Sequence, residues 1–305
     1  MRTIGIEPLV GAAGEPVDLR RTLASHGVAT LAPQRVDTDH WVLETTLDLE
    51  GGLVRTVSVA AGRPDEIVIR AEGAVLPSRQ RAALVGAVRR ILALDEDLGA
   101  FYELAARDPE LAWVTSGAGR MMRSPTVFED VVKTVCTTNC AWSATVRMTD
   151  ALVGQLGAPA ADGRRAFPSP AAMAEAGPSF YRDVARAGYR GAYLLRLARE
   201  VADGELDLEG LRDPELEDSD VEKRLLDLPG VGPYAAAHVM LTSLGRYGRL
   251  IFDSWTRPTY ARLRGRAASD TTIARRFRPY GTYAGLAFWL YLTKSWVEDE
   301  VAGEG

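Results

Sequence analysis

Residues 225–257, LLDLPGVGPYAAAHVMLTSLGRYGRLIFDSWTR, hold the clearest chemical pattern in the chain. A helical stretch leads into Pro229-Gly230-Val231-Gly232, which predicts a tight turn, and a second helix begins at Pro233 or Tyr234, where proline suits the first turn. Glycine on both sides of Val231 permits a positive φ and removes the Cβ atoms that would block a close neighbour. The backbone N–H groups of this turn and the positive end of the next helix can bind an anion such as a phosphate. An ordinary connector between two helices would have the same local sequence.

An acidic residue follows the turn at a defined spacing. Asp253 comes 21 residues after Gly232, directly behind an apolar Leu-Ile-Phe. An aspartate in front of a helix is commonly an N-cap. A fixed carboxylate can also stabilise developing positive charge or orient a water molecule. The local sequence leaves both roles open.

The turn and the aspartate together resemble the helix-hairpin-helix DNA glycosylase superfamily. In that family the hairpin grips the DNA backbone and the aspartate lies at the mouth of the base pocket, a pattern similar to LPGVGPYAAAHVM followed by LIFDSW. Three other stretches resemble the 8-oxoguanine glycosylases: SPTVFEDVVKTVCTTNCAW (124–142), Gly188-Tyr189-Arg190, and YGTYAGLAFWLYL (280–292). The resemblance covers residues 115–295 well and is weak before them.

The resemblance implies an enzyme of base excision repair. Such an enzyme flips a damaged base out of double-stranded DNA and hydrolyses its N-glycosidic bond. Cleavage builds positive charge on the sugar, which a carboxylate beside C1′ stabilises, so we expect Asp253 to be catalytic. The resemblance places Asn139, Tyr189 and Arg190 beside the vacated space, with Tyr189 as a wedge. The expected contacts to the DNA backbone are Pro229, Gly230, Val231, Gly232 and Arg257.

One departure from the family pattern concerns the reaction type. Glycosylases of this family that also cut the strand use a lysine two residues after the last hairpin glycine, and this lysine forms a Schiff base. Tyr234 occupies that position here, and Lys133, Lys223 and Lys294, the lysines of the chain, lie outside the motif. Because tyrosine cannot form an imine, the sequence predicts a monofunctional glycosylase that leaves an abasic site.

A second departure concerns the damaged base. Phe288 replaces the glutamine that the 8-oxoguanine enzymes offer to the base, and His238 replaces a cysteine under the base. We expect a pocket lined by Tyr234, His238, Trp255 and Phe288, whose rings suit electron-poor alkylated purines, as in the alkyladenine branch. The prediction is therefore a damaged purine, alkylated or oxidised. Phe288 and His238 as plain core residues, and an 8-oxoguanine enzyme with an altered pocket, are the alternatives.

The sequence predicts no resident cofactor. Cys136 and Cys140 cannot supply the four thiolates of the iron–sulfur cluster found in the endonuclease III branch, so we expect buried thiols and no cluster. The histidines His26, His40 and His238 lie far apart and show no metal-binding spacing. A monovalent cation held by hairpin carbonyls occurs in the family, and the resemblance extends that option to this chain.

The secondary structure that must position these residues is predicted to change along the chain, from strands to helices. The stretches HWVLETTLDL, LVRTVSVAA and EIVIRAEG, between residues 40 and 73, alternate apolar and polar residues and predict antiparallel strands. From about Leu76 onward the period is helical, as in VFEDVVKTV and YLLRLAREVA. We therefore expect an α+β chain with an N-terminal antiparallel β-containing domain, residues 1–115, and an all-α helix-hairpin-helix body, residues 116–305.

Composition bounds the class of protein. The chain has 305 residues, of which 47% are hydrophobic and 25% charged, as in globular proteins. The net charge of −5 argues against bulk coating of nucleic acid, but residues 201–222 carry ten acids and one arginine, whereas residues 246–280 carry nine arginines and two aspartates. We therefore expect salt-sensitive DNA binding on one face. Arg246, Arg249, Arg257, Arg262, Arg264 and Arg266 are the first candidates for phosphate contacts, unless some pair with the acidic stretch.

Location and rival functions complete the predictions. No apolar run reaches the roughly 18 residues of a membrane helix, and residues 1–10 lack the apolar core of a signal peptide, so we expect a cytoplasmic protein without membrane contact, associated with the nucleoid if it is bacterial. We also expect a monomer. A hairpin can also belong to a DNA-binding protein without catalysis. Such a module needs no aspartate at this spacing, so Asp253 favours the enzyme.

Overall fold

A computed structural model describes residues 1–49 and 52–297. Its sheet consists of β1 (Arg2–Pro8), β2 (Arg35–Asp37), β3 (Val42–Leu49), β4 (Leu53–Ala61) and β5 (Glu66–Ala71). All neighbouring strands are antiparallel, in the order β1-β5-β4-β3-β2. The expected α+β class and antiparallel sheet are confirmed.

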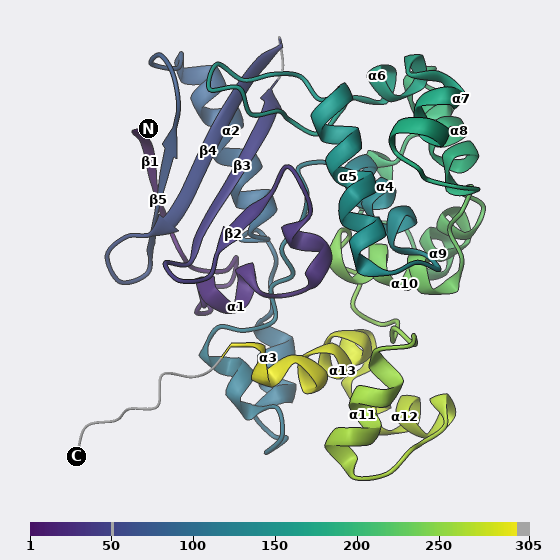
Figure 1. Ribbon diagram of the computed structural model, residues 1–305. Helices are drawn as coiled ribbons and strands as arrows, with labels where there is room; N and C mark the ends of the chain where they lie inside the picture. The colour runs from purple at the N-terminus through teal and green to yellow at the C-terminus, as the bar shows by residue number, and fades with distance from the viewer. Residues whose placement is uncertain (50–51, 298–305) are drawn as a thin grey trace.

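One face of the sheet is buried because alternate side chains are apolar. Leu43 of β3 pairs with Val59 of β4, which pairs with Ile69 of β5, and all three are fully buried. Helix α2 (Ser78–Ile91) covers this face and adds Leu84 and Val88 to the same cluster. Figure 1 shows the purple strands on one side of the molecule with α2 behind them.

A second group of helices packs beside the sheet (Figure 1). It comprises α4 (Val127–Thr137), α5 (Trp142–Leu156), α6 (Pro170–Glu175), α7 (Gly177–Ser179), α8 (Arg190–Ala202), α9 (Asp218–Leu226) and α10 (Pro233–Thr242). Helix α4 is its centre, since every residue from Val127 to Cys136 is buried. Thr126 caps this helix by accepting the N–H of Glu129 at 3.2 Å.

A third cluster joins distant parts of the chain. Helix α3 (Gly99–Ala105) packs with α11 (Thr256–Arg264), α12 (Asp270–Phe277) and α13 (Ala284–Thr293), as Figure 1 shows. Residues 98–114 thus contribute side chains to the helical cluster, and the boundary near residue 115 stays a prediction. The remaining short elements are α1 (Leu19–Leu23), η1 (Gly27–Thr30), η2 (Ala112–Ser116), η3 (Phe180–Val184), η4 (Glu209–Arg212), η5 (Arg278–Tyr283) and η6 (Lys294–Trp296).

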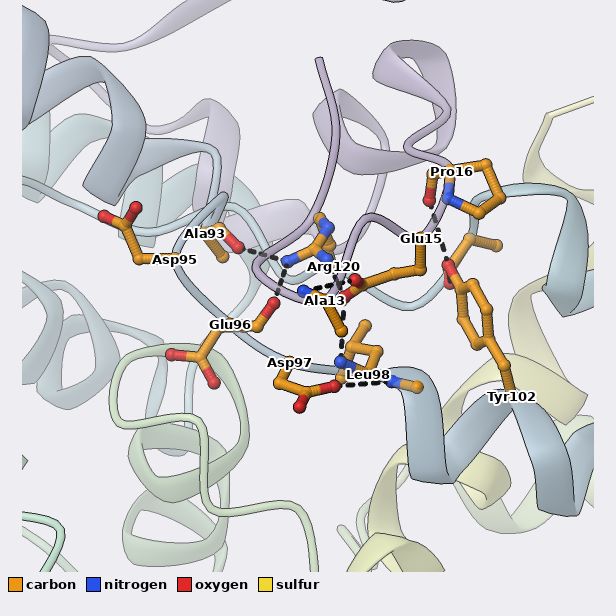
Figure 2. Close-up of polar contacts among 12 residues, drawn as sticks. Ala13, Glu15, Pro16, Ala93, Asp95, Glu96, Asp97, Leu98, Tyr102 and Arg120 are labelled. Carbon is orange, nitrogen blue, oxygen red and sulfur yellow. Dashed lines mark hydrogen bonds and ion pairs between the residues drawn. The ribbon is translucent and has the colours of Figure 1, made fainter. Parts of the chain in front are cut away.

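A buried ion pair joins the N-terminal segment to the segment between η2 and α4. Arg120 Nη2 lies 2.5 Å from Glu15 Oε1, and both side chains are almost fully buried (Figure 2). The other guanidinium nitrogen of Arg120 donates to the carbonyls of Ala93 and Glu96, while Glu15 accepts the N–H of Leu98 at 2.9 Å. Because these partners come from three segments, their relative placement is well defined.

Among the described residues, no helix combines the length and the apolar composition needed to cross a bilayer.

Candidate active site

The hairpin forms where the sequence predicts it. Helix α9 ends at Leu226, and α10 begins at Pro233 with Gly232 as its N-cap. Gly230 has φ of +81°, and the N–H of Val231 donates to the carbonyl of Leu228 at 3.2 Å. Gly232 has φ of −103° and a Cβ added to it would meet open space. The expected positive φ therefore applies to Gly230, whereas Gly232 leaves room for a neighbour outside the chain.

A cavity of about 760 Å³ lies beside this hairpin. Its walls come from the turn after α4, the start of α8, the hairpin, the start of α10 and the loop before α11. Seven residues proposed from the sequence line it: Asn139, Tyr189, Gly230, Val231, Gly232, Tyr234 and Asp253. Segments that are far apart in the chain thus meet around one space large enough for a nucleobase.

Asp253 is held by the start of the following helix. Its Oδ1 accepts the backbone N–H groups of Trp255 at 2.8 Å and Thr256 at 2.6 Å, and its own N–H donates to Thr256 Oγ1 at 2.9 Å. The helix-capping role considered for this residue is therefore real, although the N-cap position itself is Trp255. It does not exclude catalysis, because the half-buried side chain also lines the cavity.

Tyr234 lies close to this carboxylate. Burial raises the pKa of its hydroxyl, a side-chain hydrogen bond with Thr137 lowers it, and the charge of Asp253 raises it further. The hydroxyl thus stays protonated at neutral pH and can donate a hydrogen bond. At the position where the family pattern has the Schiff-base lysine, this chain has the neutral, largely buried ring of Tyr234.

Asn139 and Tyr189 form a second wall of the cavity. Asn139 has φ of +45°, and its Nδ2 donates to the hydroxyl oxygen of Tyr189 at 3.4 Å. Tyr189 is 54% exposed at the cavity edge, where a wedge would have to lie. Arg190 is nearly buried: its guanidinium lies 4.6 Å from the centre of the Tyr189 ring and donates to the carbonyl of Thr138. Arg190 therefore packs against the ring of Tyr189 and does not line the cavity.

His238 lies one layer behind Tyr234. The two ring centres are 6.0 Å apart, and His238 is 4% exposed. Its Nδ1 lies 3.5 Å from Thr134 Oγ1 and 3.4 Å from Thr242 Oγ1, and burial lowers its pKa to about 4. The ring of His26, from the N-terminal segment, lies 5.6 Å further on. The structure therefore places His238 as a satisfied core histidine beneath the cavity wall.

Of the other two expected pocket residues, Phe288 lies in the core, and Trp255 is partly buried and packs against that core. Phe288 is fully buried, with its ring centre 5.6 Å from Phe252 and 5.3 Å from Phe277. Trp255 packs between Trp289 and Trp296. Neither Phe288 nor Trp255 lines the cavity, because aromatic side chains of α13 draw both into the third cluster.

Most of the basic candidates are paired with acids. Arg257 binds Asp270 through two nitrogens, at 2.8 and 2.9 Å, and donates to the carbonyl of Asp253 at 3.2 Å. Further ion pairs join Arg246 to Asp218, Arg249 to Glu222 and Arg264 to Glu110. Pro229 belongs to the turn but does not line the cavity.

Several residues that line the cavity were not predicted from the sequence. Tyr193, 38% exposed, lies between Tyr189 and the hairpin, and Thr137, Cys140 and Phe252 also line the space. Tyr193 could have been found, since it follows Tyr189 by one helical turn.

The described residues contain no group of three or more His, Cys, Asp or Glu side chains that could hold a metal ion. Cys136 and Cys140 are free thiols, and Cys136 is buried as expected. The expectation is wrong for Cys140, which is half-buried because it lines the cavity. A monovalent cation on hairpin carbonyls needs no such group and stays a prediction.

Comparison with known proteins bears on this geometry. No family model matches the chain. YfjP of Bacillus subtilis (strain 168), provisionally named a DNA-3-methyladenine glycosylase, is 29% identical over 134 residues, which are 42% of this chain and 46% of that protein. A Methanothermobacter thermautotrophicus protein named as a probable N-glycosylase/DNA lyase is 24% identical over 263 residues, 76% of this chain and 83% of that protein. The chain thus spans less than half of the length of the first of these relatives.

Solved structures agree in fold. The 3-methyladenine DNA glycosylase of Archaeoglobus fulgidus superposes with a TM-score of 0.73 at 20% identity, over 96% of this chain and all of that chain. The chain has the fold of the helix-hairpin-helix DNA glycosylases. The 8-oxoguanine glycosylase/lyase of Clostridium acetobutylicum, bound to double-stranded DNA, shares this glycosylase fold with a TM-score of 0.71 at 21% identity, over 96% and 99% of the two chains. The expected resemblance to this superfamily is confirmed.

Proposed function

We propose that this chain is a monofunctional DNA glycosylase that releases a damaged purine from double-stranded DNA. The observation that carries the proposal is the shared cavity. The hairpin, with Gly232 open to a neighbour, and the Asp253 carboxylate lie on the walls of one space of about 760 Å³. A module that only binds DNA needs the hairpin but not the carboxylate.

In this proposal, different parts of the cavity wall contact different parts of the DNA. The turn N–H groups and the start of α10 attract a phosphate of the strand that carries the lesion. Tyr189 fills the space that the flipped base leaves, with Asn139 beside it to contact the orphaned partner base. Both residues line the same cavity as the hairpin, so one stretch of DNA can contact all of them.

Asp253 then acts on the sugar. In the described part of the chain, both hydrogen bonds that its carboxylate accepts go to Oδ1, so Oδ2 is the oxygen available to the substrate. A fixed anion beside C1′ stabilises the oxocarbenium-like transition state and can orient the attacking water. No lysine lines the cavity, and Tyr234 occupies the position of the Schiff-base nucleophile. The product is therefore an abasic site with an intact strand.

The substrate class rests on the walls of the cavity. Tyr234, Phe252 and Tyr189 offer aromatic faces, which favour electron-poor alkylated purines. Relatives named for 3-methyladenine support this choice. An oxidised purine is the second candidate, because other neighbours are named for 8-oxoguanine.

The test is base release from matched duplexes. Each duplex carries one lesion, namely an alkylated purine, 8-oxoguanine, hypoxanthine or uracil, and is assayed with and without alkali. We expect strand breaks that depend on alkali, no adduct trapped by borohydride, and release from a damaged purine. Asp253→Asn should lower release at least about a hundredfold while retaining duplex binding, since Asn keeps an oxygen acceptor for the helix cap. Wild-type protein that binds duplex but releases none of these bases would be a binding module.

A further inference from the structure

The acidic segment, residues 201–222, binds the side chain of one arginine through several hydrogen bonds. Arg246 lies in the loop between α10 and α11, and its side chain is only 11% exposed. Its Nη1 donates to the carbonyl of Leu216 and to Asp218 Oδ1, each at 2.7 Å, and its Nη2 donates to the carbonyl of Asp213 at 2.7 Å. With three acceptors around it, this guanidinium is not free to bind DNA phosphate.

We infer that Arg246 is a positioning residue, which fixes the loop bearing Asp253 against the first helix of the hairpin. This inference rests on the proposed function. Asp218 is the first residue of α9, which leads into the hairpin, and Arg246 follows α10, which leaves it. Their ion pair therefore joins the start of the first hairpin helix to the segment that follows the second. The turn proposed to bind phosphate lies between these two points of the chain, and the loop that bears Asp253 begins at the second of them.

The opposite side of the loop is held by the start of α13. The carbonyl of Tyr247 accepts the N–H groups of Gly285 at 2.7 Å and Leu286 at 3.2 Å. A Cβ added to Gly285 would lie 2.1 Å from the carbonyl oxygen of Arg249, so only glycine permits this approach. The loop thus runs between two supports, one made by the Arg246 side chain and the other by the backbone.

The chain between these two supports and Asp253 is closely packed. Ile251 is 2% exposed, and the ring of Phe252 packs on Phe288 with centres 5.6 Å apart. Asp253 then caps α11 through its Oδ1. A shift of the loop at Arg246 is therefore transmitted to the carboxylate, and a displacement of about 1 Å at a reacting group can cost roughly a hundredfold in rate.

A neighbouring ion pair supplies the control. Arg249 binds Glu222 at 2.6 Å, which joins the same loop to the same helix α9. The side chain of Arg249 is 46% exposed, whereas that of Arg246 is 11% exposed, so solvent screens the Arg249–Glu222 pair more and this pair contributes less to holding the loop. Asp218→Asn and Glu222→Gln remove one negative charge each from one helix, and their effects on long-range attraction to DNA should match.

The experiment compares single-turnover base release with duplex affinity. The lesion is the one that the wild-type enzyme releases, and affinity is measured on a duplex carrying an abasic-site analogue. We expect Asp218→Asn to lower the rate constant about tenfold, and Arg246→Gln to lower it further, while Glu222→Gln stays within about twofold of wild type. Arg246→Lys should recover part of the rate, because one cationic donor still reaches Asp218. The affinities of Asp218→Asn and Glu222→Gln should agree within about twofold.

Two results would overturn the inference. Equal rate constants for Asp218→Asn and Glu222→Gln would show that the Arg246–Asp218 pair does not position the loop. A loss of affinity in Arg246→Gln with an unchanged rate constant would make Arg246 a phosphate contact. Thermal unfolding of each variant checks the fold, and Arg246→Lys keeps the test available if Arg246→Gln does not fold. Wild-type protein that releases no base is a different outcome, which removes the proposed function before any variant is compared.

Discussion

The ring of Tyr193 lies directly against the backbone of Gly230. A Cβ added to Gly230 would approach Tyr193 Cδ2 to 2.7 Å. The same ring meets that of Tyr189 edge to face, with centres 5.9 Å apart. One tyrosine on α8 thus connects Tyr189 to the hairpin and fixes their relative placement.

The two hairpin glycines predict different outcomes for the same substitution. Gly230→Ala forces a side chain into φ of +81° and against Tyr193, so we expect a loss of about 1–3 kcal/mol in the free energy of unfolding. Gly232→Ala meets neither strain nor a neighbour and should unfold like the wild type. Its affinity for duplex DNA should nevertheless fall, because the added methyl group occupies the approach of the phosphate. Denaturant unfolding and fluorescence titration measure the two effects, and unchanged DNA affinity in Gly232→Ala would argue against a phosphate at this turn.

A lysine introduced at position 234 should give the enzyme a covalent intermediate. Tyr234→Lys places an amine in the cavity beside Asp253. We expect this variant, unlike the wild type, to be trapped on lesion-bearing DNA by borohydride, since a lysine there can attack C1′. A denaturing gel of the trapped adduct is the readout. Failure to trap a variant that still binds and folds would mean that the carbon attacked lies away from this position.

The exposed wedge should matter for catalysis more than for stability. Tyr189→Ala removes a half-exposed ring, so its melting temperature should stay close to that of the wild type. Base release should fall about tenfold or more, because stacking against a base is worth about 1–3 kcal/mol. Leu263→Ala, an exposed apolar side chain on α11, is the control and should change neither quantity. Equal rates for both variants would leave the wedge role without support.

Two buried histidines predict a loss of stability in acid. Burial lowers the pKa of His26 to about 3 and that of His238 to about 4, from the ordinary value of 6.5. Below pH 6.5 the unfolded chain binds protons that the folded chain does not, so the free energy of unfolding falls as the pH falls. Each histidine contributes roughly 1 kcal/mol per pH unit through this window. Burial raises the pKa of Glu129 and Asp130, and these carboxyls work in the opposite direction.

His238→Gln separates the histidine contribution from the carboxyls, which are common to both proteins. Urea unfolding between pH 5 and pH 7 should show a smaller slope of free energy against pH in this variant than in the wild type. Parallel curves would mean that His238 takes up protons over this range equally in the folded and the unfolded protein.

Local sequence was enough for the parts of the site that depend on local backbone. The hairpin, the start of α10 at Pro233 and the capping by Asp253 all follow from the preferences of glycine, proline and aspartate at a few neighbouring positions. The strands and helices follow from the period of apolar residues, which each element shows on its own. The absence of a lysine at position 234 is likewise visible without coordinates.

Tertiary packing decided which of these residues meet. His238, Phe288 and Trp255 have the ring chemistry of a base pocket, yet none of them lines the cavity. Partners from other parts of the chain hold them, namely His26 and Thr134 for His238, Phe277 for Phe288, and Trp289 for Trp255. Arg246 has the charge of a phosphate contact, yet Asp218 and two carbonyls enclose it. Side-chain type and spacing thus determined the available chemistry. Exposure to the cavity depended on long-range packing and on the pairing of opposite charges, which no local window of the sequence contains.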